Sequence, residues 1–397
     1  MVSVNDVQRA HESIKSFIHK TPLIYSHSLS KLTKTEIYLK AENLQRTGSF
    51  KVRGALNKMI NIKGKKVITA SMGNHAQGVA FAASRLGKHA KVVMPVTAPI
   101  VKEEATRNYG AQVVLYGESF KEALNYALSD KEHTFIHAFD DDEVIAGQGT
   151  IGIEISEDLK DIDVVLVPIG GGGLISGISV ALKAIFPKTE IIGVQTESAI
   201  SAYLSLRNRE VSEMLPLHTL ADGIAVGRVG SRTFDIINTY VDDIVLVHED
   251  SIAKAILLFL EREKTVVEGA GAVPLAALLD DEERFRGKCV VLVVSGGNID
   301  FTIIDRIIYK GLVTSGRIGV FEVTVEDIPG SLHSLTGIIA SHRGNILNVV
   351  HDRIARDLSV GETRVIFTVE TRGKEHLDEI LFDLREKGFE LKDRTGG

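Results

Sequence analysis

The sequence contains only one cysteine, Cys289, among its 397 residues. A single thiol cannot close a disulfide within the chain and cannot supply a zinc site built from cysteines, so the composition excludes both. Cys289 lies in the apolar segment KCVVLVV, where a small thiol most simply packs as a buried strand residue.

Long apolar runs and an excess of positive charge are also missing. No segment approaches the roughly 18 consecutive apolar residues of a membrane-spanning helix, and the N-terminus lacks the basic start and apolar centre of a secretory signal. The formal net charge is -6, with acidic and basic residues mixed along the chain, which does not indicate binding to nucleic acid or to a membrane. We therefore expect a cytoplasmic protein whose partners are small molecules and copies of itself.

The 397 residues exceed what one compact core usually holds, so two or three domains are expected. Short apolar runs alternate with segments of helical periodicity through the first 310 residues. Runs that are apolar on both faces and separated by helices are typical of parallel sheets covered on each side. An α/β architecture with two sheets is therefore expected. Its strands are predicted at 66–71, 90–96, 111–117, 134–139, 163–169, 190–196, 243–249 and 289–295.

A run of four glycines follows one of these strands and precedes a helical segment: Gly170, Gly171, Gly172 and Gly173. Because glycine has no Cβ, such a turn brings several N–H groups close to a ligand, and amides at a helix N-terminus carry partial positive charge. The run predicts a phosphate site. A tight turn without a ligand is the alternative, although one or two glycines suffice for that.

Two further loops with unusual residues follow predicted strands, at 71–75 and at 295–298. Ligands of open α/β sheets bind outside the carboxyl ends of the strands, so we expect these two loops and the glycine run to form one site. A separate segment, GSFKVRGA at 48–55, contains Lys51. Taken alone, this residue is most often a solvated lysine.

The pattern of the sequence changes after Tyr309. Residues 310–317 are small and polar, and the following segments predict the order βαββαβ, a ferredoxin-like unit. We expect a first domain at 1–310 with a smaller subdomain, roughly 45–140, inserted in a larger one. A linker at 311–317 and a second domain at 318–397 follow.

The segments GSFKVRGA, SMGNHAQGVA, GGGGL and SGGN, in this order and spacing, resemble those of fold type II pyridoxal-phosphate enzymes, which share the fold of the tryptophan synthase β chain. Within that group the chain is similar to the threonine dehydratase (threonine ammonia-lyase) and serine racemase branch, with further matching stretches at 146–155, 219–226, 241–252 and 266–273. The resemblance covers residues 1 to 310. The residues after it resemble an ACT regulatory domain, through their strand order and the segment VEDIPGSL.

This resemblance implies pyridoxal 5′-phosphate as the cofactor and assigns its contacts. Lys51 forms the imine with the cofactor aldehyde and later takes the Cα proton, which requires a neutral amine and so a lowered pKa. The phosphate is held by the backbone amides of the glycine run and of Leu174.

The resemblance also assigns the contacts of the cofactor ring. Asn74 binds the ring hydroxyl, Phe50 lies against the ring and Ser295 meets the pyridine nitrogen. A neutral hydroxyl does not favour a protonated ring, which suits elimination. Read without the resemblance, Asn74 is a common turn residue, Phe50 a core residue and Ser295 a helix cap.

The substrate carboxylate is expected at a helix start, whose residues are Ser71, Met72, Gly73, Asn74 and His75, with Gln148 as a second candidate. Met72 stands where racemases of this group have a serine base, and a thioether carries no proton, so racemisation is disfavoured. Gln195 and Ser201 stand where relatives with a divalent-cation site have acidic side chains. No metal site made of acidic side chains is therefore expected, whereas a monovalent cation bound by backbone carbonyl groups is left open.

In the second domain, the resemblance implies an effector site for an amino acid such as isoleucine or valine. Its expected residues are Asp327, Pro329, Gly330 and Leu332, with Asn345 and Ile346 near the start of the next strand. A purely structural or dimerising module is the alternative. Paired ACT domains would also make the protein a homodimer or homotetramer.

The expected function is the conversion of L-threonine to 2-oxobutanoate and ammonia, and of L-serine to pyruvate. Four alternatives stay open: a serine racemase, a β-replacement synthase of the cysteine synthase kind, a nicotinamide-dependent oxidoreductase and a non-catalytic amino-acid sensor. The oxidoreductase is the least compatible, because GGGG lacks the GxGxxG spacing of dinucleotide-binding turns.

Overall fold

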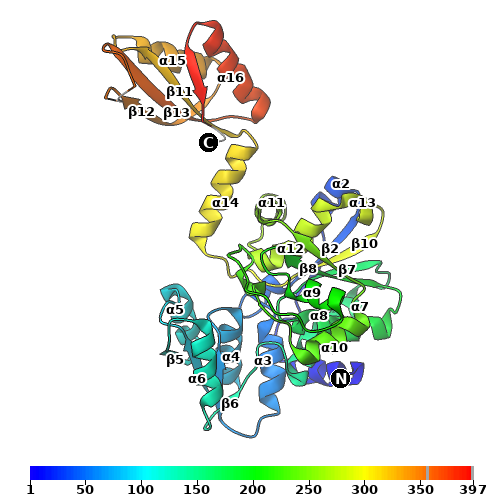
Figure 1. The fold of residues 1–397 in the computed structure, drawn as a ribbon. Helices are drawn as coiled ribbons and strands as arrows, with labels where there is room; N and C mark the ends of the chain where they lie inside the picture. The colour runs from blue at the N-terminus through cyan, green and yellow to red at the C-terminus, as the bar shows by residue number, and fades with distance from the viewer. Residues whose placement is uncertain (355–356, 395–397) are drawn as a thin grey trace. The chain divides into compact units, whose positions relative to one another are not determined.

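The computed structural model describes residues 1–354 and 357–394. They form two compact units, Met1–Ile299 and Asp300–Gly397 (Figure 1). None of the helices in the described part of the chain is long and apolar enough to span a bilayer.

The larger sheet of the first unit has six strands in the order β1-β2-β10-β7-β8-β9. All neighbouring strands are parallel except β1 and β2. Every residue of β7 is buried, as expected for a strand with helices on both faces. The strands are β1 Leu23–Tyr25, β2 Glu36–Ala41, β7 Val164–Pro168, β8 Glu190–Thr196, β9 Asp243–Val247 and β10 Cys289–Val294.

The smaller sheet has four parallel strands in the order β5-β4-β3-β6. They are β3 Lys66–Ala70, β4 His89–Met94, β5 Gln112–Leu115 and β6 Thr134–Phe135, all between β2 and β7 in the sequence. Each of the eight predicted strands is present, and the predicted two-sheet α/β fold is confirmed. Strands β1 and β2 were not predicted.

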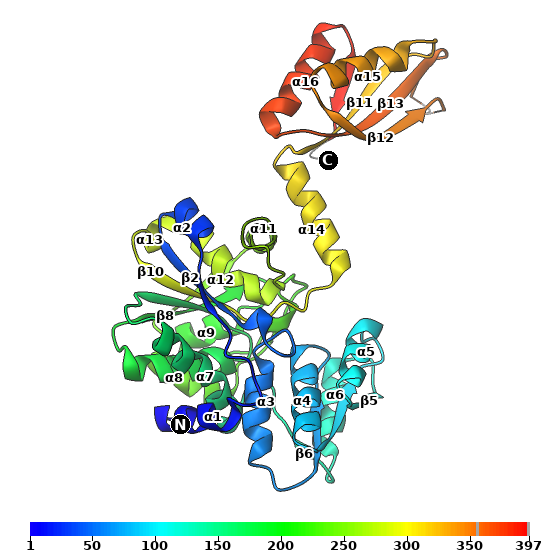
Figure 2. The same ribbon diagram turned by 180° about the vertical axis from the view of Figure 1, so that it is seen from behind.

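Helices surround both sheets, and Figure 2 shows α3 between α1 and α4. The helices of the first unit are α1 Val4–Ile14, α2 His27–Thr33, α3 Lys51–Ile60, α4 Asn74–Arg85, α5 Ile100–Asn108, α6 Phe120–Ser129, α7 Asp142–Asp158, α8 Gly173–Ile185, α9 Ser201–Asn208, α10 Ser231–Tyr240, α11 Glu249–Leu258, α12 Gly269–Asp280 and α13 Glu282–Phe285. Short helical turns lie at η1 Glu42–Leu44, η2 Asp222–Ile224 and η3 Phe259–Glu263.

The second unit has the predicted βαββαβ order around a core that includes Phe321 and Phe367. Its antiparallel sheet has the order β12-β13-β11-β14. The elements are β11 Ile318–Glu326, α15 Ser331–Ser341, β12 Asn345–Asp352, β13 Glu362–Glu370, α16 Lys374–Glu386 and β14 Glu390–Asp393.

The boundary between the units differs from the expected one. Helix α14 Phe301–Thr314 belongs to the second unit and runs through the first residues of the expected linker at 311–317. Ile304 and Ile307 are buried along it, so an apolar face stabilises this helix, which ends at Thr314 within the expected linker.

Candidate active site

Two of the predicted segments, 48–55 and 295–298, are joined by backbone contacts. The Phe50 N–H donates to the Ser295 carbonyl at 3.1 Å, and the Gly297 N–H donates to the Gly48 carbonyl at 2.9 Å. Gly48 has φ +70, and a Cβ there would overlap the side chain of Asn298, so the turn requires glycine. The start of α3 is thereby fixed to the carboxyl end of β10.

The third segment joins them through Asn74, the first residue of α4. Its Oδ1 accepts a 2.8 Å hydrogen bond from Asn298 Nδ2, which also donates to the Thr47 carbonyl at 2.8 Å. Asn74 Nδ2 donates to Glu268 Oε1 at 2.7 Å. Of the three loops expected to converge, those at 71–75 and 295–298 are therefore in direct contact.

Lys51 is the first residue of α3, and its Nζ donates to the Ala138 carbonyl at 3.2 Å. Burial lowers the pKa of Lys51 to about 8, and the nearby Glu268 carboxylate opposes this shift. Nζ also lies 5.0 Å from the centre of the Phe50 ring. A lysine in such surroundings supplies a neutral amine at a far lower pH than a solvated one.

The glycine run forms the turn between β7 and α8, with Gly172 at φ +94 as the N-cap residue. A Cβ on Gly171 or Gly173 would collide with Phe139. Within residues 1–354 and 357–394, the amides of Gly170, Gly171 and Gly172 have no acceptor. Leu174, in the first turn of α8, is buried in the core of the larger sheet. Unpaired donors at a helix N-terminus form an anion site.

The helix start at 71–75 follows β3, as predicted. The Ser71 hydroxyl accepts from the Gly73 N–H at 3.3 Å, and Met72 packs against the core of the smaller sheet. His75 is buried, with Nε2 3.1 Å from the Ile136 carbonyl, and burial lowers its pKa to about 3. The His75 ring is therefore neutral and is held by the core.

Gln148 lies on α7 and contacts α3. Its Oε1 accepts from the Gly54 N–H at 3.2 Å, and its buried Nε2 has no partner in the described chain. Gly54 follows Lys51 by one turn, so Gln148 supports the helix that begins at the lysine. Its expected contact with a substrate stays a prediction.

A buried ionic cluster lies behind the same helix. Arg53 Nη2 is 2.8 Å from Glu42 Oε1, and Arg53 Nη1 is 2.7 Å from Glu154 Oε1. Lys40 Nζ is 2.6 Å from Glu154 Oε2. The cluster connects α3 to β2, η1 and α7 through Arg53, which lies two residues after Lys51.

Ser295 is buried at the end of β10. It does not cap a helix, because the next helix, α14, has Asp300 as its N-cap. Gln195 accepts from the Tyr203 N–H at 2.8 Å, and the Ser201 hydroxyl donates to the Val226 carbonyl at 2.8 Å. Both of these side chains therefore have partners within the protein.

The expected effector residues do not all lie together in one copy of the chain. Gly330, at φ +101, caps α15 beside Pro329 and Leu332, and Asp327 Oδ2 accepts from Arg353 Nε at 2.8 Å. Asn345 pairs with Glu370 across the sheet, whereas Glu326 pairs with Glu362. These two pairs lie eight positions apart along strand β13, or roughly 25 Å, so Asn345 and Ile346 lie at the other end of the sheet from Asp327.

Several residues near Lys51 were not predicted as site residues. Glu268 is the N-cap of α12, only 5% exposed, and burial raises its pKa to about 7 although the Asn74 hydrogen bond opposes the shift. Ala138 and Phe139 contact Lys51 and the glycine run. Glu268 lies in the stretch 266–273, which resembles the family, so its position could have been found from the sequence. The contact of Ala138 uses its backbone carbonyl, which every residue has, so no sequence signal points to it.

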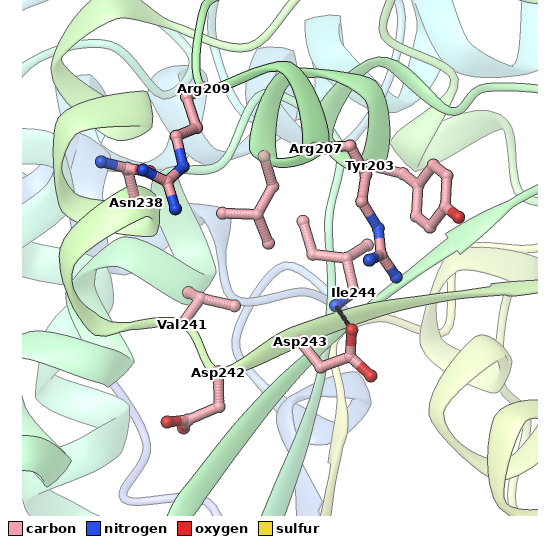
Figure 3. Close-up of a pocket in the computed structure, with 9 residues that line it drawn as sticks. Tyr203, Arg207, Arg209, Asn238, Val241, Asp242, Asp243 and Ile244 are labelled. Carbon is pink, nitrogen blue, oxygen red and sulfur yellow. Dashed lines mark hydrogen bonds between the residues drawn. The ribbon is translucent and has the colours of Figure 1, made fainter.

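A separate cavity of about 570 Å³ lies between α9, α10 and β9 (Figure 3). None of the predicted site residues lines it. It contains Asp242 and Asp243, at the amino end of β9, whereas ligands of open α/β sheets bind at the carboxyl ends. Lys183 pairs with Asp242 at 2.7 Å, and Arg284 pairs with Asp243 at 3.0 Å.

Comparisons with known proteins place the chain in a family. The family described as "Pyridoxal-phosphate dependent enzyme" matches residues 14–296. The L-threonine ammonia-lyase of Thermotoga maritima is 49% identical over 399 residues, which cover 99% of this chain and 99% of that protein. The structure of threonine deaminase isoform 2 from Solanum lycopersicum, in its processed form, is 41% identical and covers 77% of this chain and 86% of its own, with a TM-score of 0.74. The structure of serine racemase from Dictyostelium discoideum is 36% identical and covers 75% and 99%, with a TM-score of 0.71.

Proposed function

Because this chain belongs to the family of pyridoxal-phosphate-dependent enzymes, we propose that it is an L-threonine ammonia-lyase that releases 2-oxobutanoate and ammonia. The observation that carries the proposal is the position of the Lys51 amine. It lies where three loops meet, and the adjacent residues Ala138 and Phe139 connect it to a glycine turn with unpaired amides. Similarity over nearly the whole length of a threonine ammonia-lyase supports the choice of substrate.

The residues of the site fit pyridoxal 5′-phosphate. The amides of the glycine turn accommodate its phosphate, and the collisions that a Cβ would cause explain why the turn consists of glycine. Asn74 and Ser295 supply polar groups for the ring hydroxyl and nitrogen, and Phe50 supplies an apolar surface. When bound, this cofactor withdraws electrons from the Cα of an amino acid.

Lys51 is the proposed base for the substrate Cα proton. Its pKa of about 8 makes a substantial fraction of the amine neutral near physiological pH, as proton transfer requires. The departing hydroxyl needs a proton, and Lys51 or Glu268 can hold one close to the site. The amides at the start of α4 are proposed to bind the substrate carboxylate.

Elimination is favoured over racemisation because Met72 has no acidic proton. L-Serine differs from L-threonine by one methyl group, so we propose that it is also a substrate and yields pyruvate. Methyl-group discrimination in an apolar pocket is modest, roughly 10- to 200-fold. A β-replacement synthase would instead consume an added nucleophile such as sulfide.

The second unit is proposed to be an ACT domain that binds an amino acid such as isoleucine or valine. The two groups of expected effector residues lie at opposite ends of one sheet, so a site that contains both needs two copies of the chain. Edge strand β12 exposes Leu347, Val349 and Val350, which a second copy would cover. This arrangement supports a homodimer or a homotetramer. A cytoplasmic location stays a prediction from the sequence.

The test is an assay of keto-acid release from L-threonine and L-serine by wild type, Lys51→Ala and Lys58→Ala. Lys58 is a matched control, because it lies on α3 and pairs with Asp141 and Glu143. We expect Lys51→Ala to lose the visible absorbance of the imine between the lysine and the cofactor, and all keto-acid release, and Lys58→Ala to keep both. Full turnover by Lys51→Ala would refute the assignment, and bound cofactor without turnover in wild type would favour a sensor.

Regulation is tested separately by deletion of residues 318–397. We expect the response of activity to added isoleucine or valine to disappear. An unchanged response in the truncated protein would exclude the second unit as the effector site.

A further inference from the structure

The segment 137–140, between β6 and α7, contacts both Lys51 and the glycine turn through two consecutive residues. The Ala138 carbonyl accepts from Lys51 Nζ at 3.2 Å. The Phe139 ring lies where a Cβ on Gly171 would be, and its own Cβ lies near Gly173. The lysine amine and the glycine turn are therefore connected through two adjacent residues.

The conformation of this segment is fixed by His137. Its Nδ1 accepts from the Phe139 N–H at 3.2 Å and from the Asp140 N–H at 2.8 Å. The His137 and Phe139 rings also pack edge to face, with centroids 4.7 Å apart. Burial lowers the pKa of His137, which keeps Nδ1 available as an acceptor.

Asp140 fastens the segment to the N-terminus of α10. One carboxylate oxygen accepts from Arg232 N–H at 2.9 Å and from Thr233 N–H at 3.3 Å, and the other accepts from Ser231 N–H at 3.2 Å. Helix α10 has no side-chain cap from its own N-cap residue, Gly230, so Asp140 takes that role from another part of the chain.

Helix α10 in turn holds the glycine turn. The Thr233 hydroxyl donates to the Gly171 carbonyl at 2.7 Å, and the Gly230 N–H donates to the same carbonyl at 3.2 Å. A Cβ on Gly172 would collide with Thr233 and Ile237. The orientation of the glycine amides therefore depends on where the first turn of α10 lies.

We propose that Asp140 is a positioning residue that sets the separation between the Lys51 amine and the phosphate-binding amides of the glycine turn. It acts through α10 on the turn and through the Ala138 carbonyl on the amine. This inference rests on the proposed roles of Lys51 and the glycine turn. The fixed separation then suits only a ligand whose aldehyde carbon and phosphate group lie that distance apart.

The experiment compares Asp140→Ala, Asp140→Asn and Asp142→Ala in the full chain. Asp142 is the matched control, because its carboxylate also contacts α10, through the Arg232 guanidinium at 2.8 Å, but leaves the helix amides untouched. The dissociation constant of pyridoxal 5′-phosphate is measured by absorbance on cofactor-free protein. Thermal unfolding of the same samples reports general destabilisation.

We expect Asp140→Ala to raise the dissociation constant by about 10-fold or more, because a lost helix cap disorders the first turn. Asp140→Asn keeps one acceptor oxygen and is expected to lie between wild type and Asp140→Ala, and it serves as the test variant if Asp140→Ala does not fold. Asp142→Ala is expected to stay within about 2-fold of wild type.

Two results would overturn the inference: equal dissociation constants for Asp140→Ala and Asp142→Ala, or a lower unfolding temperature of the Asp140 variants with unchanged cofactor affinity. Failure of the wild-type chain to bind the cofactor would instead overturn the proposed function, so the two failures are distinguishable.

Discussion

The carboxyl group of Glu268 is buried beside Asn74, which donates a 2.7 Å hydrogen bond to it. Among the charged groups that act on this carboxyl group, Asp222 raises its pKa and Lys102 lowers it. Burial has the largest effect on this carboxyl group and raises the pKa of Glu268 to about 7. The site thus contains an acid that exchanges its proton near neutral pH, close to the Lys51 amine.

Replacement of Glu268 by glutamine should make the unfolding free energy of the cofactor-free protein less dependent on pH. The folded-state pKa is raised from 4.5 to about 7, so the stability from this group is fully present below pH 4.5 and is lost as pH rises through 7. The loss is on the order of 3 kcal/mol. Urea unfolding at pH 5 and pH 8 should show a smaller difference for Glu268→Gln than for wild type.

The control for this comparison is Glu283→Gln, whose carboxylate is exposed and pairs with Arg286. We expect its pH dependence to match that of wild type. If Glu268→Gln and Glu283→Gln have the same pH dependence, the buried carboxyl group does not contribute in the way described.

The rate at which cofactor-free protein takes up pyridoxal 5′-phosphate should depend on pH through Lys51. Only the neutral amine is a nucleophile, and burial lowers the pKa of Lys51 to about 8. The rate constant should therefore rise with pH and level off above about 8. Stopped-flow absorbance between pH 6 and pH 10 measures it, and a rise that continues to pH 10 would show that the amine is as basic as a solvated lysine.

The predicted strands were those whose apolar residues are consecutive, such as β7 and β10, because burial on both faces leaves a clear pattern. Strand β2 was missed because Lys40 interrupts its apolar run. The structure buries Lys40 completely and pairs it with Glu154, more than a hundred positions along the chain. Local sequence does not reveal such compensation by a distant residue.

The active site also contains residues that local sequence reveals and residues that it does not. Lys51, Asn74 and the glycine turn lie in segments with unusual composition, so they were predictable. Glu268 lies in a stretch that resembles the family, but nothing in the residues around it indicates that its carboxyl group is buried. The contact of Ala138 uses only its backbone, which any residue at that position would supply.

Alanine at Gly171 should weaken cofactor binding, because its Cβ would collide with the Phe139 ring and displace the turn. Gly337→Ala is the control, since a Cβ there meets nothing within 4 Å and alanine favours helix α15. The dissociation constant of pyridoxal 5′-phosphate should rise for Gly171→Ala and stay unchanged for Gly337→Ala. Smaller side chains at position 139 should restore part of the affinity, whereas no restoration would mean that Phe139 is not the obstacle.

The buried ionic cluster behind α3 permits a double-mutant test of whether Lys40 and Glu154 neutralise each other. Glu154→Gln leaves the ammonium of Lys40 buried without a counter-ion and should reduce the unfolding free energy by about 3–5 kcal/mol. Lys40→Met combined with Glu154→Gln removes that charge as well, so the pair should cost less than the sum of the single changes. Urea unfolding of the four proteins measures the coupling. Additive costs would mean that Lys40 and Glu154 do not compensate each other, and that Arg53 alone neutralises Glu154.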